Sequence, residues 1–149
     1  MPGPEEPTAP DMILHASCVA VVGRAVLIRG ASGTGKSALA LELMSRGAAL
    51  ISDDRTCLTR SAGAVIASAP ETLSGLIEAR GVGILRAPAG PPSPVMLSVD
   101  LDRTERDRLP PPRNQTILGQ SIPLLHKVDS AHFPAAILQY LTSGPWTHP

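Results

Sequence analysis

The sequence predicts one α/β domain, a P-loop-containing mixed β-sheet with hairpins, and three features predict it. The chain has 149 residues, which is the length of a single domain with its own hydrophobic core. Residues 30–37 read GASGTGKS between an apolar run and a helical pattern, the strand–loop–helix order of a phosphate-binding loop. Short apolar segments separated by glycine turns are typical of hairpins.

The first hairpin is expected within residues 13–30, which read ILHASCVAVVGRAVLIRG. The turn falls at Gly23 and Arg24, and the second arm, residues 25–29, is a short buried strand that leads into the loop. Residues 1–11 are rich in proline and acidic residues, so we expect them to form a disordered tail.

A helix and another strand are expected after the loop. The helical pattern covers residues 37–46 and ends before Gly47, a residue type favoured just past a helix end. Its apolar face consists of Leu39, Leu43 and Met44. Residues 48–52 then read as a strand. We expect it to lie beside the strand over 25–29 in a right-handed crossover.

The rest of the chain predicts more hairpins, a long loop and a final helix. We expect a hairpin of strands 56–60 and 64–68, and then a loop or short helix followed by a strand within 69–85. A proline-rich surface connector over 87–94, a strand over 95–101, a charged and proline-broken loop over 102–115 and one or two edge strands within 116–125 should follow. The last element is a helix over 130–141, with Ser130 as N-cap and an apolar stripe of Phe133, Ile137, Leu138 and Leu141. We therefore expect a single domain over 12–143 and a short tail over 144–149.

Composition excludes several classes of function. The 13 basic and 13 acidic residues balance, so no surface for nucleic acid or anionic membrane is expected. One Phe, one Tyr and one Trp leave little for base stacking on single-stranded nucleic acid. Cys18 and Cys57 lack metal-site spacing and are expected to be small buried thiols. We find no signal-peptide pattern and no apolar run of membrane-spanning length, so we expect a cytoplasmic location.

The loop over residues 30–37 carries the strongest chemical signal, a Walker A pattern. Backbone N–H groups of such a loop surround an anion, and the following helix adds its N-terminal partial charge. Lys36 would reach the β- and γ-phosphates of ATP, and the Ser37 hydroxyl would bind Mg²⁺. The residues expected to bind the nucleotide are Gly30, Ala31, Ser32, Gly33, Thr34, Gly35, Lys36 and Ser37. The alternative is a glycine-rich turn without a ligand.

Two adjacent carboxylates, Asp53 and Asp54, follow the strand over 48–52. Successive side chains of a strand point to opposite faces, so the two residues cannot share one role. One is expected to point towards Mg²⁺ or its waters, and the other to accept a proton from an incoming hydroxyl. A capped turn with two solvated acids is the alternative.

Over residues 13–109 the chain resembles the HPr kinase/phosphorylase family. The segments LHASCV, GASGTGKS, LELMSRGAALISDD and IEARGVGIL occur in the order and spacing of that family. The resemblance implies a fold similar to the family's C-terminal domain and to the nucleotide-binding fold of phosphoenolpyruvate carboxykinase. It also implies transfer of phosphate from ATP to a serine of the phosphocarrier protein HPr of the phosphotransferase system, and in many members the reverse phosphorolysis.

The resemblance implies roles for individual residues near the acidic pair. His15 matches the family's active-site histidine, which interacts with that pair, although a lone histidine at a strand end is often structural. Asp54 matches the acceptor of the serine proton and Asp53 its partner. Lys36 and Ser37 match the phosphate-binding lysine and a magnesium ligand.

Two later segments extend the resemblance. In IEARGVGI, Glu78 matches a second magnesium ligand. Arg80, Gly81 and Gly83 match the rest of a family segment that is associated with both the kinase reaction and the reverse phosphorolysis. The segment ERDRLP is similar to the family's DRLG and places Arg108 at its catalytic arginine. A solvated charged loop is the alternative for Arg108.

The chain departs from the longer family members in two places. About a dozen residues precede LHASCV, so we expect a short form that contains only the C-terminal catalytic domain. Residues 122–132, IPLLHKVDSAH, stand where longer members have a PVRPGRN-like loop tied to phosphorolysis. The arginine and glycine of that loop are gone, which leaves the phosphorylase activity open unless Lys127 or His126 substitutes. Homo-oligomer formation and the docking of HPr stay open as well.

Two other functions remain open beside the HPr kinase. One is a non-catalytic nucleotide-sensing switch, and the other is a P-loop kinase that acts on another acceptor. Nucleotide binding alone does not require His15, Asp53, Asp54 and Glu78 together, which favours a kinase. A small-molecule kinase normally needs an inserted lid, and the loops here are mostly short.

Overall fold

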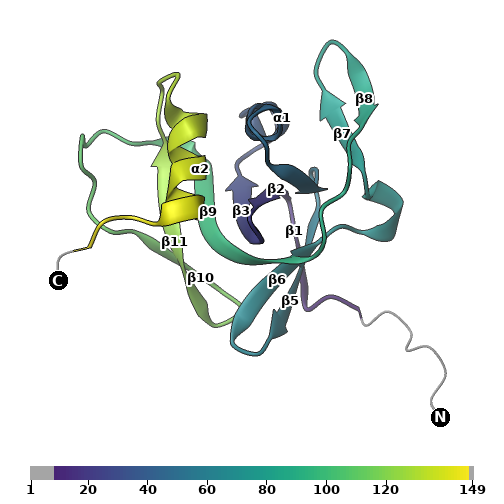
Figure 1. Ribbon diagram of the computed structural model, residues 1–149, viewed down its shortest axis with the longest axis horizontal. Helices are drawn as coiled ribbons and strands as arrows, with labels where there is room; N and C mark the ends of the chain where they lie inside the picture. The colour runs from purple at the N-terminus through teal and green to yellow at the C-terminus, as the bar shows by residue number, and fades with distance from the viewer. Residues whose placement is uncertain (1–8, 148–149) are drawn as a thin grey trace.

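A strongly curved nine-stranded sheet forms the body of the protein in the computed structural model, which describes residues 9–147 (Figure 1). Most of the tail expected over 1–11, and the last two residues, lie outside the described residues. The elements are β1 (Met12–Leu14), β2 (Ala16–Val21), β3 (Arg24–Arg29), α1 (Lys36–Ser45), β4 (Ala49–Ser52), β5 (Thr56–Ser61), β6 (Ala64–Ser68), the 3₁₀ helix η1 (Glu71–Leu73), β7 (Leu76–Ala79), β8 (Gly83–Arg86), β9 (Ser93–Thr104), β10 (Asn114–Ile117), β11 (Gln120–Lys127) and α2 (Phe133–Ser143).

The sheet is mixed, as expected. Its strands follow the order β1-β5-β6-β9-β3-β2-β4, β11 also pairs with β9, and β10 pairs with β11. The pairs β3–β9 and β9–β11 are parallel and the others are antiparallel. The long strand β9 makes this possible, because its start pairs with β6 and its later residues pair with β3 and β11.

The hairpin of β2 and β3 forms as predicted, with its turn one residue earlier. Val22 and Gly23 both have positive φ, 47° and 73°, which is the two-residue turn that matches the twist of paired strands. The hairpin places Arg29, the last residue of β3, opposite Ala16 at the start of β2. The end of β3 therefore lies at the break between β1 and β2, where His15 stands.

The expected position of the strand after α1 was wrong. β4 does not lie beside β3, because β2 and β9 already occupy the two edges of β3. It pairs instead with the far edge of β2, antiparallel to it, and so runs parallel to β3 two places away. The consequence for the site is unchanged, since β3 and β4 still end at the same edge of the sheet.

Two apolar cores fill the two faces of the sheet. Alternation along β3 sends Val26 and Ile28 to the face covered by α1 and α2, and Leu27 to the face enclosed by the curling sheet (Figure 1). The predicted stripe of α2 packs on the helix-covered face, with Phe133 and Ile137 buried.

The predicted start of the last helix was three residues too early. α2 begins at Phe133, and Pro134 occupies its first turn. Ser130 is therefore not the N-cap. Its hydroxyl lies 2.8 Å from Nδ1 of His132 instead.

The hairpin within 69–85 and the end of β9 differ from the expectation, whereas the proline-rich connector and the strands after the loop agree with it. The stretch 69–85 forms η1 and a separate hairpin, β7–β8, rather than one strand. The proline-rich connector lies along the edge of β4, where the Gly90 N–H donates to Leu50 O at 2.7 Å. The strand β9 continues to Thr104, and two strands, β10 and β11, follow the loop.

Both cysteines are free and buried, as predicted. Burial raises the pKa of the Cys18 thiol and of the Cys57 thiol above the usual range. Because the thiolate is the reactive form, we expect neither cysteine to react with a disulfide reagent in the native protein at pH 8. Both are expected to react after unfolding in guanidinium chloride. Fast labelling of the native protein would contradict the buried positions.

Candidate active site

The loop between β3 and α1 has backbone conformations that favour glycine. Gly33 and Gly35 have φ of 86° and 100°, and α1 begins directly afterwards at Lys36. Gly30 has φ of 155°, and a Cβ atom there would lie 2.5 Å from Oγ1 of Thr34. The glycines of the motif are therefore required by geometry, and the first backbone N–H groups of α1 face the loop.

The ammonium group of Lys36 lies inside this loop. Its side chain is buried, and Nζ donates to the carbonyl oxygens of Gly30 and Ala31 at 2.7 and 3.2 Å. The Ala31 N–H in turn donates to Oδ1 of Asp102 on β9 at 2.9 Å. Asp102, which the sequence analysis did not identify, thus ties the loop to the sheet.

Asp53 is a buried acceptor for three donors. Its Oδ1 accepts the hydroxyls of Ser17 and Ser37, each at 2.7 Å, and its Oδ2 accepts the N–H of Glu78 at 3.0 Å. The side chain is 8% exposed. One carboxylate therefore connects β2, the start of α1 and the hairpin strand β7.

Asp54 has different surroundings, as the alternation along the chain predicts. Its side chain is 60% exposed, and its Oδ1 accepts a hydrogen bond from Nε2 of His15 at 2.5 Å. The residue has φ of 67°, a left-handed conformation that turns the chain after β4. Its N–H donates to Oγ of Ser17 at 3.3 Å, so Ser17 contacts both members of the acidic pair.

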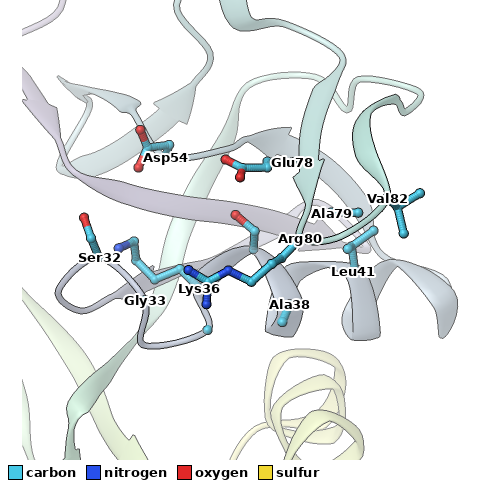
Figure 2. A pocket seen from close by; sticks show the side chains of 12 residues that line it. Ser32, Gly33, Lys36, Ala38, Leu41, Asp54, Glu78, Ala79, Arg80 and Val82 are labelled. Atoms are coloured by element: carbon cyan, nitrogen blue, oxygen red, sulfur yellow. The ribbon is translucent and has the colours of Figure 1, made fainter.

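Most of the predicted site residues line one cavity of about 600 Å³ (Figure 2). Figure 2 shows Asp54 and Glu78 on one side of the cavity and Lys36 with the loop on the other, while Arg80 extends from the hairpin towards Lys36. The lining residues are Ser32, Gly33, Gly35, Lys36, Ser37, Ala38, Leu41, Asp54, Glu78, Ala79, Arg80 and Val82.

A second cavity of about 310 Å³ adjoins the other side of the loop. Its lining residues are Leu14, His15, Arg29, Gly30, Ala31, Asp100 and Asp102. Asp54 lines the first cavity, whereas its partner His15 lines the second. The hydrogen-bonded pair therefore stands between the two cavities, where a group in either one can reach it.

Three residues considered for catalysis line neither of these cavities. Arg108 is exposed in the loop between β9 and β10, which Figure 1 shows on the opposite side of the molecule from the β7–β8 hairpin. His126 and Lys127 lie on β11, and Lys127 Nζ is 3.5 Å from Oδ1 of Asp129. The guanidinium that lines the first cavity belongs to Arg80.

Ser17, like Asp102, is a site residue that sequence reasoning missed. It is fully buried, and its side chain points to the α1 side of the sheet with its hydroxyl on Asp53. The only signal in the sequence is a hydroxyl residue within the otherwise apolar strand ASCVAV. Such a serine is usually a neutral core residue, so this signal is too weak to identify it.

Comparisons with known proteins relate this chain to one family. The HPr serine kinase C-terminal domain model matches residues 6–89. HPr kinase/phosphorylase of Clostridium tetani is 44% identical over 85 residues, which cover 57% of this chain and 28% of that protein. HPr kinase/phosphorylase of Bordetella pertussis is 49% identical over 78 residues, which cover 52% of this chain and 25% of that protein.

A solved structure extends the likeness beyond the matched sequence. The Hpr(Ser) kinase/phosphatase from Coxiella burnetii superposes with a TM-score of 0.72 at 27% identity. The alignment covers 85% of this chain and 91% of that one, so the two chains share the same mixed α/β fold. The chain spans about a quarter of the length of the curated relatives described above. This chain belongs to the HPr serine kinase C-terminal domain family.

Proposed function

We propose that this chain is an ATP- and Mg²⁺-dependent kinase that phosphorylates a serine of an HPr-type phosphocarrier protein. The observation that carries the proposal is the single cavity shared by the loop lysine and the two carboxylates Asp54 and Glu78. Family membership supports the same reaction, since the relatives are HPr kinase/phosphorylases. We take residues 12–143 as the kinase domain. A cytoplasmic location fits the finding that no helix within residues 9–147 is long and apolar enough to cross a membrane.

The loop would hold the phosphates of ATP. Lys36 would exchange the carbonyl oxygens of Gly30 and Ala31 for the β- and γ-phosphates, where its charge opposes the charge that spreads during transfer. Arg80 lines the same cavity and would supply a second positive charge beside the phosphates. Arg108 remains assigned by its sequence match alone, since it lines neither cavity.

The residues present fit Mg²⁺ as a ligand set. Ser37 and Glu78 supply a hydroxyl and a carboxylate on the same cavity, and Mg²⁺ prefers a few protein oxygens completed by phosphates and water. Within residues 9–147 no group of three His, Cys, Asp or Glu side chains could hold a metal ion by itself. When bound, the ion would neutralise phosphate charge and fix the phosphate geometry.

Asp54 would accept the proton of the incoming serine hydroxyl. The carboxylate is accessible, and the bond to His15 fixes one of its oxygens. In the reverse direction the protonated group would return that proton to the departing serine oxygen. Because Lys127 and His126 line neither cavity, the kinase direction is the one we propose, with phosphorolysis to be measured separately.

The test is an ATP phosphotransfer assay on purified HPr from the same organism, read by intact mass. One added phosphate on HPr with the wild type, and none with Lys36→Ala, is the expected result. Adding inorganic phosphate to the phosphorylated product then measures the reverse reaction. Nucleotide binding without any transfer would instead favour the sensing switch or a kinase for another acceptor. Whether the chain forms a homo-oligomer is a separate question, which size-exclusion chromatography would answer.

A further inference from the structure

The apolar end of the first cavity lies between the first two turns of α1 and the tip of the β7–β8 hairpin. We propose that this end binds the nucleoside of the phosphate donor, and that it accepts adenosine and guanosine with similar affinity. This proposal rests on the proposed function for the identity of the donor, but not on the identity of the phosphate acceptor.

The polarity of the cavity sets the direction in which the donor lies. The groups for transfer, Asp54 and Lys36, stand at one end, with Asp54 joined to His15 of the neighbouring cavity. Figure 2 shows Leu41 and Val82 together at the other end, away from Ser32 of the loop. The transferred phosphoryl group must face Asp54. The leaving part of the donor therefore extends towards Leu41 and Val82.

The far end has the composition of a base pocket. Ala38 and Leu41 are three residues apart on α1, so they lie on one flank of the helix, and Ala79 and Val82 face them from the hairpin. Small ligands bury most of their surface in apolar pockets that hold a few polar groups, and the cavity volume of about 600 Å³ lies in the usual range for them.

Val82 is exposed at a place where a ligand would cover it. Its side chain is 74% exposed although it lines the cavity. The turn that carries it is fixed, because the Val82 N–H donates to Ala79 O at 2.9 Å and Gly81 has φ of 84°. A large apolar side chain held in an ordered turn at a cavity wall is suited to packing on the flat face of a base.

The same end offers little to distinguish one purine from another. Figure 2 shows Arg80 extending from the hairpin towards Lys36, so the far end is left with aliphatic side chains that carry no hydrogen-bonding groups. Discrimination requires a contact that one base makes and the other lacks, so we expect the affinities for MgADP and MgGDP to agree within about fivefold.

Isothermal titration of Val82→Asp and Ile84→Asp with MgADP, MgGDP and magnesium tripolyphosphate tests the proposal. Ile84 is the matched control, because it is 65% exposed on the same hairpin and does not line the cavity. Val82→Asp is expected to weaken both nucleotides by about tenfold or more, since it removes the burial of a valine side chain. It should leave tripolyphosphate unchanged within about twofold, because that ligand has no nucleoside. Ile84→Asp should change none of the three affinities.

Several outcomes would overturn the inference. They are unchanged nucleotide affinity in Val82→Asp, an equal loss for tripolyphosphate, the same loss in Ile84→Asp, or a wild-type preference for one purine nucleotide well beyond fivefold. Val82→Ala, which keeps the turn uncharged, should show a smaller nucleotide-specific loss in the same direction. A failed HPr assay beside the expected titrations would remove the proposed acceptor and leave the nucleoside site in place. Normal phosphate transfer to HPr beside unchanged titrations would remove only the nucleoside site.

Discussion

Replacing Asp54 with Asn is expected to lower the rate of phosphate transfer to HPr by about 10²- to 10⁴-fold, the usual contribution of a general base. The amide keeps the shape of the side chain but cannot accept the serine proton. Nucleotide affinity and the free energy of unfolding should change little, because the side chain is 60% exposed and, within residues 9–147, its side chain is hydrogen-bonded only to His15. Single-turnover phosphotransfer, MgADP titration and urea unfolding measure the three quantities.

Asp100→Asn is the matched control for this prediction. Asp100 is a carboxylate on the second cavity. Its Oδ1 accepts a hydrogen bond from the N–H of Asp102 and not from Asp53 or Asp54. Its replacement should change the transfer rate far less than Asp54→Asn does. A loss of nucleotide affinity in Asp54→Asn as large as the loss of rate would show that Asp54 acts in binding and not as the base.

The features that the sequence predicted well are those encoded by neighbouring residues. The strand, glycine loop and helix over residues 24–45 follow one another directly, and the two fixed glycines of the motif, Gly30 and Gly35, both have positive φ. The hairpin β2–β3 has a two-residue turn, so its pairing needs no distant information. Such local patterns sufficed to predict an α/β fold with a mixed sheet.

The features that the sequence predicted poorly depend on distant partners. The place of β4 was wrong because the partner of an apolar strand depends on which edges other strands occupy, here β2 and β9 on β3. Ser17 was missed because its contact, Asp53, lies 36 residues away and a serine in a strand carries no mark of its partner. Glu78 and Arg80 were named from the sequence, but the separate β7–β8 hairpin that carries them to the cavity was expected as a single strand (Figure 1).

Replacing Asp53 with Ala is expected to lower the free energy of unfolding by about 2–3 kcal/mol. The change leaves the hydroxyls of Ser17 and Ser37 and the Glu78 N–H without their acceptor, in a place where Asp53 itself is only 8% exposed. Removal of a buried charge offsets part of this loss, and the two hydroxyls can turn towards each other. Three donors to one carboxylate outweigh those gains, because a hydrogen bond to a charged group contributes about 1.5–3 kcal/mol.

Ser17→Ala and Ser98→Ala separate the structural effect of Asp53 from its effect on the site. Both serines are fully buried, but the Ser98 hydroxyl donates to Gln115 and has no contact with the acidic pair. Ser98→Ala should cost about 1 kcal/mol in urea unfolding, since it removes one neutral buried hydrogen bond. Ser17→Ala should cost about 2 kcal/mol, because it removes the bond to the Asp53 carboxylate and the one from the Asp54 N–H. Only Asp53→Ala and Ser17→Ala should also weaken the Mg²⁺-dependent part of ADP binding, because Asp53 holds the hydroxyl of Ser37. Wild-type stability in Asp53→Ala would show that the three donors find other partners. An equal loss of ADP affinity in Ser98→Ala would show that Asp53 does not organise the site.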